Sequence, residues 1–343
     1  MLLKNTGFHP ASGLGNTHFQ TIFPALFRRL PKFETELETF ELPDGDFLEC
    51  YWYQRPGKNS NRPIVTLFHG LEGSFRSSYI RGMMRALKNT GYSTVLMHFR
   101  GCSGKPNRLP RSYHSGDTAD AAAWLKSLKN RYPNAPLFAI GYSLGGNMLL
   151  KLLGEQGSNS LLDVAVSVSA PLQLDVSAGR MERGFSRLYQ YYLLRGLKAK
   201  LVKKYMSHPM ESLLGTKVET IKKISNFHTF DDLYTAPIHG FVSADDYYRR
   251  SSAKQYLGNI GTPTLIVQAL DDPFMTEEIL PGSSELSKAI TLEVYPHGGH
   301  VGFVSGTLWK PEYWLESRVP EYFSGFTFSG SSKRSYAAPR MQV

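Results

Sequence analysis

Short apolar segments alternate with longer segments of helical periodicity along most of the chain, and this alternation predicts the fold. Apolar runs of strand length occur at Pro63–Phe68, Ser93–Phe99, Leu137–Tyr142, Val164–Ser169, Thr264–Ala269 and Leu292–Tyr295. Apolar residues at helical spacing lie between them at Ser77–Asn89, Asp117–Lys129, Leu144–Leu153 and Thr276–Ser287. Strands that alternate with helices are typical of a mostly parallel sheet with helices on both faces.

A hairpin is expected ahead of these elements. Phe33–Phe40 and Phe47–Tyr53 alternate in polarity on either side of Pro43-Asp44-Gly45, which predicts two antiparallel strands joined by a turn. Together with the apolar runs, the hairpin brings the expected sheet to about eight strands.

The alternation stops after the sixth predicted strand. Residues 171–255 contain no clear strand but several helical stretches, the longest of which spans Phe185–Met206. We therefore expect an α/β core made of residues 1–170 and 256–322, with a helical cap inserted at residues 171–255. Residues 323–343 include a stretch rich in Ser, Gly and Phe and are expected to form a loose C-terminal tail.

Composition narrows the class of protein. The chain has 343 residues, of which 41% are hydrophobic and 20% charged, as in ordinary globular domains. Its two cysteines cannot build a disulfide scaffold and suit a reducing compartment. No secretory signal is visible at the start, and no uncharged apolar run approaches the roughly 18 residues of a membrane span. We expect a cytoplasmic protein.

The positive charge is concentrated in the predicted cap. The whole chain carries a formal net charge of +10, and residues 171–255 hold fourteen Lys and Arg against eight Asp and Glu. One hypothesis is that a basic face of the cap meets an anionic membrane surface, at the inner face of the membrane; the alternative is a solvated helix face. The basic residues of that hypothesis are Arg180, Arg183, Arg187, Lys203 and Lys204. No recognised nucleic-acid motif is present, so no nucleic-acid partner is expected.

The strongest chemical signal is Gly141-Tyr142-Ser143-Leu144-Gly145, between a predicted strand and a predicted helix. This pattern is that of the nucleophile elbow, in which a tight turn with small flanking residues exposes a serine at a helix N-terminus. A serine hydroxyl is too weakly acidic to attack an ester unaided, so it needs a base and an acid that orients the base.

The acid and the base are expected in the loops after the last two predicted strands. Asp271 and Asp272 follow one strand; Asp272 directly precedes a proline and is the favoured acid, with Asp271 then capping the helix expected near Thr276. The reverse assignment of the two aspartates stays open. His300 is favoured as the base over His297, because two glycines before it allow a close approach to Ser143. No third ligand accompanies the two histidines, so neither a metal nor another cofactor is expected.

Attack by the serine creates an oxyanion, which needs preorganised N–H donors. The backbone N–H of Leu144 follows the nucleophile, and the loop His69-Gly70-Leu71-Glu72-Gly73 supplies the second donor, assigned to Leu71. A carboxylate at Glu72 would oppose this chemistry. Glu72 is therefore expected to turn away, toward Arg76.

Together these residues resemble the YheT-like esterases, family 4 of the α/β-hydrolases. The resemblance also includes Asn16-Thr17-His18-Phe19-Gln20-Thr21, Arg100-Gly101-Cys102-Ser103-Gly104 and Gly298-Gly299-His300. It implies an α/β-hydrolase fold, a triad of Ser143, Asp272 and His300, and hydrolysis of a carboxylic ester with a short to medium acyl chain. The expected partner is a small ester or lipid-like substrate. The alternatives are an acyltransferase or thioesterase with the same triad, or a binding protein on the same fold.

Overall fold

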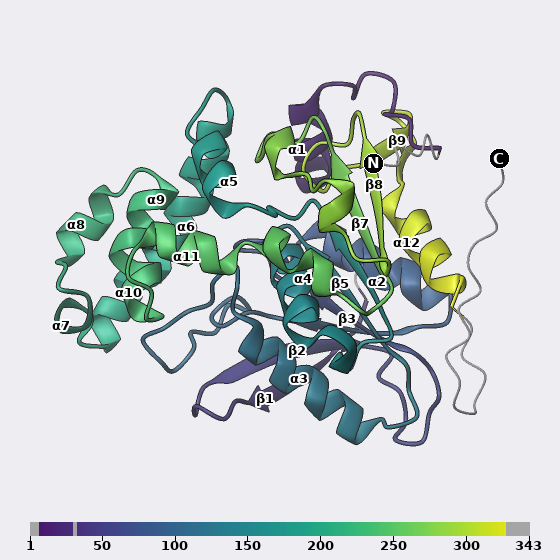
Figure 1. Ribbon diagram of the computed structural model, residues 1–343, viewed down its shortest axis with the longest axis horizontal. Coiled ribbons are helices and arrows are strands. Elements are labelled where there is room, and N and C mark those ends of the chain that lie inside the picture. Colours follow the sequence, from purple (N-terminus) through teal and green to yellow (C-terminus); the bar gives the residue numbers. More distant parts are fainter. Residues whose placement is uncertain (1–6, 30–32, 327–343) are drawn as a thin grey trace.

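The computed structural model (Figure 1) describes residues 7–29 and 33–326 and is built around an eight-stranded sheet. The strands lie in the order β1-β2-β4-β3-β5-β6-β7-β8. Their bounds are β1 Glu36–Glu41, β2 Phe47–Tyr53, β3 Ile64–Phe68, β4 Ser93–Met97, β5 Leu137–Tyr142, β6 Val164–Val168, β7 Thr264–Ala269 and β8 Ile290–Tyr295. β2 is antiparallel to both β1 and β4, and all other pairs are parallel. The predicted fold class is confirmed.

Helices cover both faces of the sheet because the parallel strands are apolar on both sides. On one face, α2 (Ser78–Asn89) and α12 (Leu315–Ser324) lie side by side and bury Met84, Leu87 and Phe323. On the other face lie α3 (Thr118–Arg131) and α4 (Leu144–Gln156), the latter followed by a short turn, η1 (Gly157–Asn159). A small ribbon of β9 (Val304–Gly306) and β10 (Pro311–Tyr313) precedes α12.

The insertion between β6 and β7 forms a helical lobe beside the sheet, on the left in Figure 1. Its elements are α5 Leu174–Met181, α6 Ser186–Ser207, α7 Met210–Leu214, α8 Val218–Lys223, α9 Phe227–Phe230, the π-helical turn η2 Asp231–Thr235, α10 Ala236–Ile238 and α11 Ala244–Ser251. The 3₁₀ segment η3 (Ala253–Asn259) follows the lobe and packs on α4 in the core. The lobe has an apolar cluster of its own, which includes Leu194, Leu201 and Ile221. We refer to these helices as the cap.

Three details differ from the sequence-based expectations. A helix, α1 (Thr17–Phe27), begins after Asn16, whose side chain accepts hydrogen bonds from the first backbone N–H groups. The helix expected at Thr276–Ser287 is wrong. Its place is taken by two short 3₁₀ turns, η4 (Glu277–Ile279) and η5 (Ser283–Glu285), because Pro281-Gly282 interrupts the helical pattern.

The third difference concerns the C-terminal tail. Phe323 is fully buried and Ser324 ends α12, so this helix extends two residues into the tail expected at residues 323–343. Residues 327–343 lie outside the described part of the chain. Among the described helices, none combines the length and apolar character needed to cross a membrane.

Arg100, in the turn after β4, joins three separate parts of the core. Its guanidinium makes two hydrogen bonds of 2.7 Å to Asp120 of α3, and ion pairs of 3.0 Å and 2.8 Å to Asp46 and Asp44 of the hairpin turn. The side chains of Arg100 and Asp46 are almost inaccessible to water. The arrangement is a buried ion-pair network whose loss would leave carboxylates uncompensated.

Replacing Arg100 with Met is therefore expected to lower the free energy of unfolding by about 3–5 kcal/mol, as for other buried pairs that lose one partner. Arg108→Met is the matched control, because Arg108 pairs with Glu41 at the surface, where ion pairs contribute little to stability. Urea denaturation measures both values. Equal losses in the two variants would contradict the role of the buried network.

Candidate active site

Ser143 lies on the sharp turn between β5 and α4. Its backbone has φ 51° and ψ −120°, a conformation that costs energy for a residue with a side chain. The turn is possible because Gly141 and Gly145 approach their neighbours so closely that a Cβ on either would overlap backbone atoms. The Ser143 N–H donates to the Val168 carbonyl at 2.8 Å, which ties the turn to β6.

His300 and Asp272 complete a chain of hydrogen bonds from Ser143. The distance from Ser143 Oγ to His300 Nε2 is 2.9 Å, and the distance from His300 Nδ1 to Asp272 Oδ2 is 2.8 Å. The Asp272 side chain is 1% exposed, and its Oδ1 accepts the Phe274 N–H at 2.8 Å. Because a carboxylate only accepts, His300 donates from Nδ1, and its Nε2 is left to accept from the Ser143 hydroxyl.

Asp271 has a different set of partners. Its Oδ1 accepts the Gly299 N–H at 2.9 Å, its Oδ2 lies 3.4 Å from His297 Nδ1, and its carbonyl accepts from the Thr17 hydroxyl. The expectation that Asp271 caps a helix near Thr276 is wrong, since only the 3₁₀ turn η4 follows and Thr276, not Asp271, lies at its N-cap. Asp271 instead holds the loop that carries His300.

The N-terminal segment also holds that loop, a role that the sequence analysis missed. The Thr21 hydroxyl accepts the His300 N–H at 2.9 Å. The buried Gln20 side chain binds both the N–H and the carbonyl of Val304, at 2.8 and 3.0 Å. The only earlier sign of this role was the resemblance of residues 16–21 to a family motif.

The loop after β3 leaves one amide available for an oxyanion. The N–H groups of Gly70, Glu72 and Gly73 are taken by Tyr79 Oη, Tyr113 Oη and the Gly70 carbonyl, each at 2.9 Å. In the described part of the chain, the N–H groups of Leu71 and Leu144 have no hydrogen-bond partner, and both residues line the same pocket as Ser143. Leu144 is also the first residue of α4, where the helix dipole favours negative charge.

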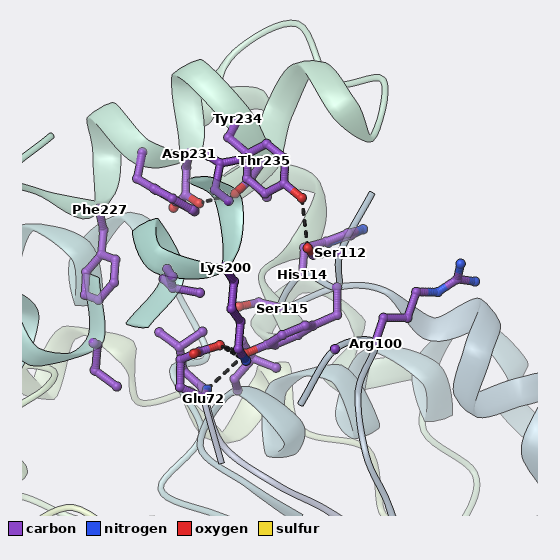
Figure 2. A pocket seen from close by; sticks show the side chains of 18 of the residues that line it. Glu72, Arg100, Ser112, His114, Ser115, Lys200, Phe227, Asp231, Tyr234 and Thr235 are labelled. Atoms are coloured by element: carbon purple, nitrogen blue, oxygen red, sulfur yellow. Dashed lines mark hydrogen bonds and ion pairs between the residues drawn. The ribbon is translucent and has the colours of Figure 1, made fainter. Parts of the chain in front are cut away.

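Glu72 turns away from these amides, but not toward Arg76 as expected. Its carboxylate accepts from Lys200 of α6 at 2.8 Å and from Tyr113 Oη at 3.1 Å. Figure 2 shows the Lys200 side chain reaching Glu72 across the pocket. The expectation for Arg76 is wrong because the partner comes from the cap, 128 positions away along the chain.

A pocket of about 840 Å³ lies between the core and the cap and contains Ser143 and His300. Much of its cap side is apolar, formed by Leu174, Met181, Leu193, Leu197, Leu201 and Phe230. Polar groups lie on other parts of the wall, including the hydrogen-bonded pair Ser112–Tyr234 at 2.8 Å (Figure 2). The cap therefore supplies both a cover and a largely apolar chamber for a bound molecule.

The basic residues of the cap do not share one outward face. Arg183, Arg187 and Lys203 are exposed, whereas the expectation that Lys204 faces outward is wrong. Lys204 is buried and donates to Asn107 Oδ1 at 2.8 Å and to the Leu109 carbonyl at 2.7 Å. Burial lowers the pKa of Lys204 to about 8.

Comparison with known proteins places the chain in a family. Residues 63–307 match the sequence profile described as the alpha/beta hydrolase fold. The chain belongs to the α/β-hydrolase family. It is also 46% identical over 319 residues to the Escherichia coli protein named "Putative esterase YheT", covering 93% of each chain, so it is a YheT-like α/β-hydrolase.

Two further matches are more distant. The mouse protein named "Phospholipase ABHD3" is 28% identical over 323 residues, which cover 92% of this chain and 77% of the relative. Among solved structures, the Pyrococcus furiosus esterase Pf2001 superposes with a TM-score of 0.54 at 17% identity, over 87% of this chain and 97% of that one. This structural likeness supports the fold alone.

Two neutral histidines support the active-site loops of this α/β-hydrolase. His69 Nε2 accepts the Phe99 N–H at 3.1 Å, so its Nδ1 donates to the Gly70 carbonyl at 2.7 Å. His98 is held in the same way, between the Phe75 N–H and the Glu49 carbonyl. Burial lowers the pKa of His69 to about 3 and that of His98 to about 4.

The lowered pKa values predict a pH dependence of stability. The pKa of a histidine in the unfolded chain is about 6.5. Below that pH the unfolded state therefore binds protons that the two native histidines do not bind. The free energy of unfolding contributed by His98 is therefore lost as the pH falls from about 6.5 to about 4. We expect the melting temperature of His98→Gln, which keeps a donor and an acceptor but cannot titrate, to fall less over this interval than that of the wild type.

The comparison between variant and wild type is needed because buried carboxyls act in the opposite direction. Burial raises the pKa of Asp231 to about 6, so its contribution to stability is lost as the pH rises. If the melting temperatures of wild type and His98→Gln fell by the same amount between about pH 6.5 and 4, this would contradict the neutral state of His98.

Proposed function

We propose that this α/β-hydrolase is a serine esterase that cleaves a carboxylic ester through an acyl-serine intermediate. The observation that carries the proposal is the hydrogen-bonded chain from Ser143 through His300 to Asp272, with the Leu71 and Leu144 amides beside it. A nucleophile, a base, an orienting acid and oxyanion donors are the groups that acyl transfer needs.

In this mechanism, Ser143 Oγ attacks the ester carbonyl while His300 Nε2 takes the hydroxyl proton. The carbonyl oxygen becomes an oxyanion, which the N–H groups of Leu71 and Leu144 stabilise. His300 then returns the proton to the departing alcohol and leaves an acyl-serine. A water molecule, deprotonated by His300, attacks the acyl group, and His300 returns the proton to Ser143 Oγ as the acid is released. Asp272 keeps His300 in the tautomer that accepts at Nε2 and stabilises its protonated form.

The substrate that we propose is a lipid-like ester with a short to medium acyl chain. The pocket of about 840 Å³ is within the range of small-molecule sites, and its apolar cap residues would cover an acyl chain. The names of the relatives point the same way, since one is given as an esterase and another as a phospholipase.

The test is labelling with a fluorophosphonate, followed by turnover of p-nitrophenyl esters of increasing chain length. We expect the wild type to be labelled and to hydrolyse these esters. Ser143→Ala should abolish labelling and lower turnover by several orders of magnitude, because no acyl-enzyme forms. Asp272→Asn should lower kcat by about 10⁴, because the orienting carboxylate is lost.

Asp271→Asn is the matched control for Asp272, since the two carboxylates are neighbours with different partners. We expect a much smaller loss of kcat in this variant. Labelling that survives Ser143→Ala would overturn the proposed nucleophile. A larger loss in Asp271→Asn than in Asp272→Asn would move the acid by one residue.

The N-terminal half of α6 supports docking on an anionic lipid surface. Phe185, Leu188, Tyr191 and Tyr192 are exposed there, among the exposed Arg183 and Arg187. Aromatic side chains next to basic ones are typical of surfaces that lie in a membrane interface. This surface is close to the catalytic residues, because Tyr189 of the same helix packs on Phe274. The Phe274 ring in turn stacks on the His300 ring, with ring centroids 3.9 Å apart.

Binding to vesicles measures this docking. The wild type should bind anionic vesicles at low salt and lose affinity as the salt concentration rises. Each arginine near such a surface is worth about 1 kcal/mol, so Arg183→Gln combined with Arg187→Gln should weaken binding by about tenfold to thirtyfold. Arg249→Gln combined with Arg250→Gln, on the separate helix α11, is the control. Unchanged binding in the first double variant would contradict this docking surface.

A further inference from the structure

Glu72 occupies a strained position in the loop that presents the Leu71 amide. Its φ is +55°, in the left-handed region that residues with a side chain rarely adopt. Such a conformation persists only where neighbouring groups hold it. The groups that hold Glu72 therefore decide whether the N–H of Leu71, the residue before it, faces the pocket.

Tyr113 holds Glu72 from the core side. Its hydroxyl accepts the Glu72 N–H at 2.9 Å and donates to the Glu72 carboxylate at 3.1 Å. Tyr113 itself is buried and stacks on Phe99, with ring centroids 5.1 Å apart. One rigid phenol thus binds both the backbone and the side chain of the strained residue.

Lys200 and Gly196 hold Glu72 from the cap side. They are four residues apart in α6 and so lie on one face of the helix. Lys200 Nζ donates to Glu72 Oε1 at 2.8 Å, while a Cβ on Gly196 would come within 2.9 Å of Glu72 Oε2. The Glu72 carboxylate thus packs against the backbone of α6 at Gly196. It also forms an ion pair with Lys200 (Figure 2).

The charge of Lys200 is directed to Glu72. Its Nζ also lies 3.4 Å from Cys102 Sγ. Burial raises the pKa of the Cys102 thiol to about 11, so the sulfur is neutral at ordinary pH. The carboxylate of Glu72 is therefore the anion that Lys200 neutralises, next to the loop where a second negative charge develops during the reaction.

We propose that Lys200 is a positioning residue for the oxyanion hole. Through Glu72 it holds the Leu71 amide toward the pocket and cancels a carboxylate charge that would oppose the oxyanion. The cap then does more than cover the substrate, since it completes the catalytic machinery of the core. This inference rests on the proposed serine-esterase function.

The test is a double-mutant cycle of Lys200→Met and Glu72→Gln, read with a neutral p-nitrophenyl ester and by the rate of fluorophosphonate labelling. Lys200→Met should lower kcat and the labelling rate by about tenfold to a hundredfold, the range for a misplaced oxyanion donor, with little change in KM. In the Glu72→Gln background, the same substitution should cost less than about threefold, because no carboxylate remains to be neutralised or held.

Two other variants separate positioning from general stability of the cap. Lys223→Met removes an exposed cap charge outside the pocket lining and should leave kcat unchanged. Gly196→Ala keeps every charge but pushes a methyl group against the Glu72 carboxylate, so it should also lower kcat. It serves as the second variant where Lys200→Met does not fold, which thermal melting reveals.

Three outcomes would overturn the inference. They are an unchanged kcat in Lys200→Met, equal costs of that substitution in the wild-type and Glu72→Gln backgrounds, and a loss confined to KM, which would place Lys200 on the substrate instead. Failure of the function itself has a different signature. In that case the wild type is not labelled at Ser143 and does not hydrolyse the esters.

Discussion

The close contact between α4 and the end of the sheet is the constraint on which the site depends. Gly141 and Gly145 allow the helix to start almost on top of β3 and β5, and this forces Ser143 into its strained turn. The strain is maintained by a core in which α4 is buried along most of its length. A looser packing of this helix would remove the turn, the exposed hydroxyl and the direction of the Leu144 amide together.

Distant segments of the chain then arrange the partners of the serine. The loops after β7 and β8 bring Asp272 and His300, and α1 holds the second loop through Thr21 and Gln20. From the cap, Lys200 binds Glu72 in the loop after β3. Ser143, His300 and the loop of Leu71 are thus each held by another part of the molecule, which is how precise geometry is kept on turns and loops.

The fold and the residues at its centre were predictable because their signals are local. Strand and helix periodicities, and the elbow at Ser143, are contained within short windows of sequence. The Pro281-Gly282 pair that ended the expected helix, and the capping residue Asn16 before α1, were also visible in the sequence. What local pattern cannot give is the partner of a side chain across the fold. Glu72 pairs with a lysine 128 positions away, and Lys204 is buried by a loop 95 positions away.

The hydrogen bond from the His300 amide to Thr21 spans 279 positions of the chain. The residues around Thr21 must therefore wait until those around His300 have been made before this hydrogen bond can form. Contacts of such long range are among the latest to form in folding, because loop closure has to be completed first. A nascent or truncated chain that contains Ser143 but lacks His300 would have no histidine beside the serine hydroxyl. The Ser143–His300 hydrogen bond, on which the proposed activation of the serine depends, can thus form only after His300 has been made.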